Sequence, residues 1–89
     1  MIKVVRKKLG KQRLWGEADY HDDSILLDVN LHGKKELEIL IHEAIHIIRK
    51  DVTEEETERI SIELTHLLWD QGFRKVDNRN DLPMQDGTL

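Results

Sequence analysis

Polar and apolar positions alternate in the first third of the chain and recur at helical spacing after it. Short apolar runs at 2–8, 12–20 and 24–30 are separated by turn residues, which is typical of strands. Residues 34–50 carry apolar side chains three and four positions apart, which predicts an amphipathic helix. The sequence therefore predicts an α+β fold in which a small N-terminal antiparallel β-sheet is followed by two helices.

The second helix is predicted from signals at its two ends. Thr53 followed by Glu56 is a capping-box pattern that starts a helix, and Gly72 before Phe73 is typical of a helix C-terminus. The apolar stripe expected between these ends comprises Thr57, Ile60, Leu64, Leu67 and Leu68.

The chain has 89 residues, which suits one domain. We expect the domain to span 1–76 and the polar residues 77–89 to form a flexible tail. Such a small domain buries only a modest core, so a bound metal ion would contribute to its folding as well as to its chemistry.

Composition narrows the possible partners and compartments. With 14 basic and 18 acidic residues the net charge is −4, which argues against nucleic acid as the main partner. The chain has no cysteine, which excludes disulfides and thiolate metal sites and fits a reducing cytoplasm. No run reads as a signal peptide or reaches membrane-spanning length. Basic residues do cluster near the start, at Lys3, Arg6, Lys7, Lys8, Lys11 and Arg13.

The most informative motif is His42-Glu43-x-x-His46 in the first predicted helix. Histidines four positions apart project side by side, so both imidazoles can reach one zinc ion. They fall on the side of the helix opposite its apolar arc, and Ile39 lies beside them. Glu43 points between the side of the histidines and the apolar arc. From there its carboxylate can take a proton from a zinc-bound water.

Zinc in a catalytic site needs a third protein ligand. No third histidine follows at short spacing, and His66 is predicted to lie on the surface of the second helix. The third ligand is therefore expected to be a glutamate of the second helix.

These features resemble the minimal gluzincin-type metallopeptidases of phages and other mobile elements. That group is similar in pattern to the ImmA/IrrE peptidases and, more distantly, to SprT-like domains. The resemblance covers about residues 15–70. It is carried by Ile25-Leu26-Leu27-Asp28, Ile41-His42-Glu43-x-x-His46 and Thr53-Glu54-Glu55-Glu56.

The resemblance implies a zinc-dependent peptidase with Glu43 as general base. Carried over by position, the zinc ligands are His42, His46 and Glu54. Glu58 remains an alternative third ligand. If the two helices run antiparallel with a rise of about 1.5 Å per residue, Glu58 should lie nearer than Glu54 to the level of the two histidines along the helix axis. Glu55 and Glu56 are expected to be solvated charges of the capping turn.

Peptidases of this kind bind substrate as an added strand along a sheet edge, and the segment 24–30 is the predicted edge. An oxyanion stabiliser is also expected, for which Tyr20, His21 and Arg74 are candidates.

Two other classes of function remain open. The chain could be a non-catalytic metal-binding interaction module, because it is too short to carry a second lobe over a deep cleft. Ile62 and Trp69, seven residues apart, would then mark a surface for a homo-oligomer or another partner. A nucleic-acid binder with a basic hairpin is the third reading.

Overall fold

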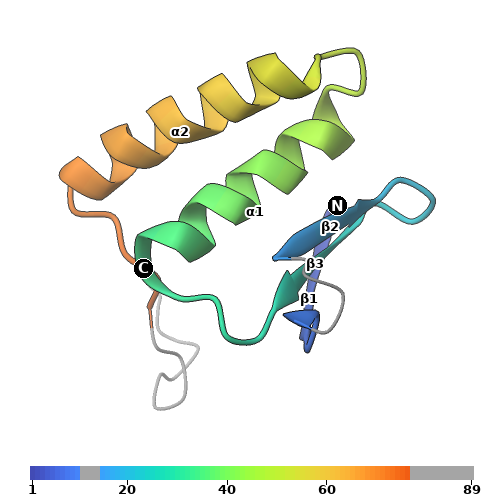
Figure 1. The fold of residues 1–89 in the computed structure, drawn as a ribbon, viewed down its shortest axis with the longest axis horizontal. Coiled ribbons are helices and arrows are strands. Elements are labelled where there is room, and N and C mark those ends of the chain that lie inside the picture. Colours follow the sequence, from blue (N-terminus) through green and yellow to red (C-terminus); the bar gives the residue numbers. More distant parts are fainter. Residues whose placement is uncertain (11–14, 77–89) are drawn as a thin grey trace.

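The computed structural model describes residues 1–10 and 15–76. Three strands are followed by two helices (Figure 1), which confirms the α+β class. The elements are β1 (Lys3–Lys7), β2 (Gly16–Asp19), β3 (Ser24–Asp28), α1 (Gly33–Ile48) and α2 (Glu54–Asp70). The beginning of the predicted second strand and the predicted tail 77–89 lie outside the described residues.

The strand order is β1-β3-β2, with β1 parallel and β2 antiparallel to β3. The prediction of a purely antiparallel sheet was therefore wrong. The order agrees with burial, because β3 carries Ile25 and Leu27, which are almost fully buried, and a central strand is shielded along both edges by its neighbours. The most apolar strand takes the centre, and the two more polar strands flank it.

The central position of β3 also corrects the predicted substrate edge. Ser24–Asp28 pairs with β1 along one side and with β2 along the other. Its backbone has no free edge on which a peptide could add, so the expectation for 24–30 was wrong.

Asp28, the last residue of β3, makes two side-chain hydrogen bonds to the backbone. Its side chain accepts hydrogen bonds from the backbone nitrogens of Asn30, at 2.8 Å, and Leu9, at 2.9 Å. These two bonds hold the pKa of Asp28 below its ordinary value. The carboxylate thereby ties the residues after β1 to the turn that leads into α1.

Helix α1 lies between the sheet and α2 (Figure 1). The hydrophobic core comprises Ile25, Leu27, Leu31 and Ile47, so Ile47 is the one buried apolar residue that α1 contributes. None of the described helices is long and apolar enough to cross a membrane.

A nearly buried carboxylate, Glu36, fixes the first turn of α1. Arg6 Nη2 and Lys75 Nζ lie 2.9 and 3.2 Å from its Oε2 atom. Burial alone would raise the pKa of Glu36, but these hydrogen bonds lower it overall. Glu36 therefore links strand β1 to the segment that follows α2.

Both predicted ends of α2 are confirmed. Thr53 Oγ1 accepts a hydrogen bond from the backbone nitrogen of Glu56 at 3.1 Å. Gly72 has a φ of 90°, and the nitrogen of Phe73 donates to the Leu68 oxygen at 3.0 Å, as in a Schellman motif.

The predicted apolar stripe of α2 was wrong in part. Thr57, Ser61 and Thr65 are the buried residues of this helix. Leu64 and Leu67 are 40% and 56% exposed. Small side chains allow two helices to approach closely, so α1 packs against the threonines and serine and leaves the leucines outside.

Candidate metal centre

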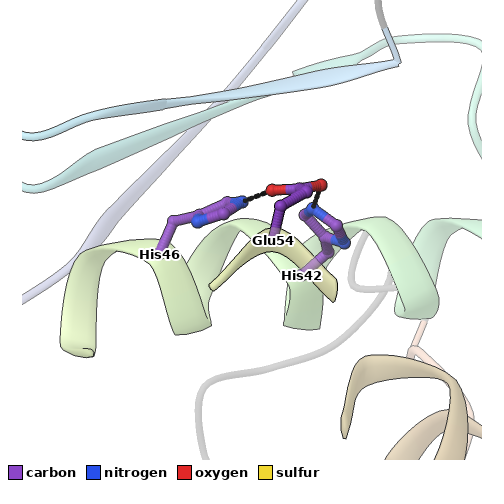
Figure 2. Close-up of side chains that lie close together, drawn as sticks. All are labelled: His42, His46 and Glu54. Atoms are coloured by element: carbon purple, nitrogen blue, oxygen red, sulfur yellow. Dashed lines mark ion pairs between the residues drawn. The ribbon is translucent and has the colours of Figure 1, made fainter. Parts of the chain in front are cut away.

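His42 and His46 lie one turn apart on α1 and project to the same side of the helix (Figure 2). Their ring centroids are 4.8 Å apart, with an edge-to-face angle of 69°. Their side chains are only 14% and 20% exposed. The histidine pair is thus held by packing rather than left free in solvent.

Glu54 is the first residue of α2, and the Thr53 cap fixes where that helix begins. The short connection after α1 makes the two helices an antiparallel pair, so the first turn of α2 returns beside the last turns of α1. Glu54 Oε2 lies 3.0 Å from His42 Nε2, and its Oε1 lies 2.9 Å from His46 Nε2 (Figure 2).

His42, His46 and Glu54 form a group that could hold a metal ion. Each offers one ligand atom, and these atoms all lie within 4.8 Å of one another. Two imidazole nitrogens and one carboxylate oxygen are the donor set of many catalytic zinc sites, and imidazole also suits other divalent transition metals. The residues present therefore fit a metal ion of this kind.

Glu58, the alternative third ligand, lies on the other side of the His42 ring. Its Oε1 atom is 3.8 Å from His42 Nδ1, whereas Glu54 faces Nε2. Glu58 thus faces the other ring nitrogen of His42, beyond hydrogen-bond distance, and does not share the position of Glu54. Glu55 is exposed and Glu56 pairs with Arg59, in line with the solvated charges expected of a capping turn.

Glu43 lies next to the histidines and beneath β2. Burial raises its pKa, while His42 and His46 act in the opposite direction. Glu54 and Glu17 raise it further, because their negative charges disfavour a second carboxylate nearby. The structure therefore provides a half-buried carboxyl group with an elevated pKa beside the candidate ligands.

Gly16 is a site residue that sequence reasoning missed. A Cβ atom at this position would lie 2.7 Å from Ile39 Cγ2 and 3.3 Å from Glu43 Cγ. Only glycine lets β2 approach α1 this closely. A glycine inside a strand often marks such an approach, but the contacting element cannot be identified from the sequence.

The other predicted residues lie away from this group. His66 contacts Lys34 Nζ at 2.9 Å on the exposed side of α2, as expected for a surface histidine. Arg74 stacks on Trp69 with its guanidinium carbon 3.5 Å from the ring centroid, at the opposite end of α2 from Glu54. Tyr20 is 49% exposed and lies near Lys50.

His21 is exposed, and its backbone nitrogen donates to Asp19 Oδ1. No described contact joins any of the three predicted oxyanion stabilisers to the candidate ligands.

The fold and the site thus define an α+β domain with a potential His-His-Glu metal centre. None of the family models, curated proteins or solved structures compared with the chain matches it. Any further assignment of function must therefore rest on the site itself.

Proposed function

We propose that the chain is a small zinc-dependent hydrolase that cleaves a peptide bond. The observation that carries the proposal is the convergence of His42 Nε2 and His46 Nε2 on the two oxygens of Glu54, with Glu43 alongside. A zinc ion bound there would acidify water and polarise a carbonyl group.

Glu43 is the proposed general base. A carboxyl group is most effective in this role when its pKa is raised toward neutrality, and burial acts on Glu43 in that direction. Its carboxylate would take a proton from the attacking water and return it to the amine that leaves.

The outer edge of β2 is the proposed site for a peptide substrate. Among the described residues, β2 pairs only with β3, so its other edge is free. A Cβ atom at Gly16 of this strand would lie 3.3 Å from Glu43 Cγ, and this closeness of β2 to the proposed base supports the choice of edge. An extended peptide could pair there as an added strand.

The first test is the metal content of untagged protein, measured by elemental analysis. We expect about one zinc ion per chain in the wild type and a loss of zinc in His46→Ala and Glu54→Gln. Glu55→Gln is the matched control, because Glu55 is an exposed neighbour on the same helical turn. A wild-type chain that binds no zinc after refolding with the metal would refute the proposal.

The second test separates catalysis from binding. Glu43→Gln should keep the zinc ion and abolish hydrolysis of an unstructured protein such as casein or of a peptide library. An active wild type with an equally active Glu43→Gln variant would exclude Glu43 as the base.

A non-catalytic metal-binding interaction module is the second candidate. It is favoured by the large apolar side chains that the helices leave exposed, such as Ile48 at 66% and Leu67 at 56%. Such a module would bind zinc, show no hydrolysis, and be indifferent to Glu43→Gln.

A further inference from the structure

Helices α1 and α2 share an aliphatic face on the side away from the candidate metal centre. On α1 its members are spaced by four, three and four residues, and on α2 by four and three, which places each set on one side of its helix. The aliphatic face comprises Leu37, Ile41, Ala44 and Ile48 of α1 and Ile60, Leu64 and Leu67 of α2.

This face is separate from the metal centre. At about 100° per residue, the α1 members lie about 150° around the helix from His42 and His46. On α2 they lie about 130° from Glu54 and Glu58. The two surfaces can therefore be occupied at the same time.

No described element covers the aliphatic face. Ile48 is 66%, Leu67 56% and Leu64 40% exposed, and the remaining four members are half-buried. The sheet packs mainly on a different side of α1, through residues such as Leu40 and Ile47, and Ala44 is the member of the aliphatic face that also packs against this core. Aliphatic side chains gathered in this way on two adjacent helices are typical of an interface.

The apolar surface continues into a groove at one end of the helix pair. The groove has a volume of about 1110 Å³ and includes Leu37 of the aliphatic face. Phe73 and Val76, also in its lining, are 63% and 62% exposed. Three basic residues, Arg6, Arg74 and Lys75, line the same groove together with Glu36. Glu36 pairs with Arg6 and Lys75, and the groove keeps a net positive charge.

The opposite end of the helix pair is acidic. The first turn of α2 carries three exposed glutamates. Glu54 belongs to the candidate metal centre and faces away from the aliphatic face, Glu55 has no such role, and Glu56 pairs with Arg59. The surface therefore has a basic end beyond the C-terminus of α2 and an acidic end at its N-terminus. A two-fold axis that crosses the helices within the interface would set each basic end against the acidic end of the other copy.

The size of the surface also suits a second copy. A helix of 16 or 17 residues is about 25 Å long, and two packed helices are about 20 Å wide, so the side of the helix pair that carries the aliphatic face measures roughly 500 Å² in projection. Phe73 and Val76 extend it toward the roughly 800 Å² per partner that a stable interface commonly buries.

We propose that the chain forms a two-fold symmetric homodimer through the aliphatic face, with antiparallel contact between the two copies of α2. Both candidate metal centres would remain open in this dimer. The proposal stands apart from the peptidase proposal, and it uses a different side of α2 from Ile62.

The test is the mass of the full, untagged chain in solution, measured by sedimentation velocity from 1 to 100 µM. We expect twice the chain mass of 10.5 kDa at the higher concentrations. Leu67→Glu should raise the dissociation constant at least 100-fold. Ile62→Glu is the matched control, because Ile62 is also an exposed aliphatic residue of α2, at 37%, but lies outside the face.

A cysteine variant keeps the proposal testable if Leu67→Glu fails to fold. The chain has no native cysteine. Leu64 lies near the middle of α2, where an antiparallel pair brings a residue close to its own copy. Mild oxidation should therefore cross-link Leu64→Cys into a covalent dimer, whereas Ile62→Cys should stay monomeric.

Three results would overturn the proposal. A wild type that stays monomeric at 100 µM would indicate that residues 77–89 or another protein covers the face. A dimer that is lost in Ile62→Glu but kept in Leu67→Glu would assign the interface to the surface around Ile62 and Trp69. Equal cross-linking of the two cysteine variants would exclude the antiparallel contact of α2.

Discussion

At the scale of single residues, the two glutamates near His42 have different positions and should differ in effect. Glu54 faces Nε2 at 3.0 Å and Glu58 faces Nδ1 at 3.8 Å. A carboxylate beside the non-coordinating nitrogen of a metal ligand fixes the orientation of its ring.

Glu58→Gln should therefore weaken zinc binding by about tenfold without abolishing it. Glu54→Gln should reduce binding much more, because it removes a ligand. Competition with a chelating dye measures both affinities, and Glu55→Gln serves as the control. If Glu58→Gln abolished zinc binding while Glu54→Gln retained it, the third ligand would be Glu58.

A second prediction at this scale concerns acid stability. Hydrogen bonds from Asn30 and Leu9 hold the pKa of Asp28 below its ordinary value of 3.8. A carboxylate with a depressed pKa stabilises the fold above its unfolded-state pKa, and this contribution is lost as the pH falls through the folded-state value.

Asp28→Asn should therefore lower Tm at pH 7, and its difference from the wild type should shrink as the pH falls below about 4. Thermal melts followed by circular dichroism from pH 2 to 7 measure this. Asp23→Asn is the control, since Asp23 is exposed and asparagine tolerates its φ of 53°. A difference that stays constant with pH would show that the ionised form contributes nothing.

At the scale of elements, the contact between α1 and α2 contains a polar group without a partner. Among the described residues, the buried hydroxyl of Thr65 makes no hydrogen bond. The equally buried Thr57 donates to the Thr53 oxygen at 2.9 Å. An unsatisfied buried hydroxyl costs about 1–3 kcal/mol.

Thr65→Val keeps the shape of the side chain and removes this hydroxyl, so it should raise the free energy of unfolding by about 1 kcal/mol. Thr57→Val should lower it, because that substitution removes a hydrogen bond. Urea denaturation of the two variants measures both effects. Destabilisation by Thr65→Val would show that its hydroxyl has a partner in solution.

At the scale of the whole molecule, the candidate metal centre joins the two helices. His42 and His46 belong to α1 and Glu54 to α2, so an ion held by all three would bind the folded chain and not the unfolded one. Ligand present at 100 times its dissociation constant stabilises the folded state by about 2.7 kcal/mol.

Saturating zinc should therefore raise the Tm of the chelator-treated protein by roughly 10–20 °C. Differential scanning fluorimetry measures this shift, and magnesium serves as the control ion because it prefers oxygen ligands. His46→Ala should show no shift with zinc. An equal shift in His46→Ala would place the bound ion elsewhere on the chain.

The sequence alone determined the parts of this protein that depend on neighbours along the chain. The positions of the two helices, the Thr53 cap, the Gly72 terminus and the shared direction of His42 and His46 follow from local spacing. Helical periodicity and capping act over a few residues, so they can be recognised without knowing the fold.

Only the tertiary structure decided what depends on contacts between distant segments. It placed β3 at the centre of a mixed sheet, set Gly16 against α1 and brought Glu54 to both imidazoles. It also buried Thr65 and left Leu64 exposed. These residues lie eight and seven positions after Thr57, and both spacings return to the same side of a helix. Strand order and the relative placement of helices are set by which surfaces bury each other, and local patterns do not contain that information.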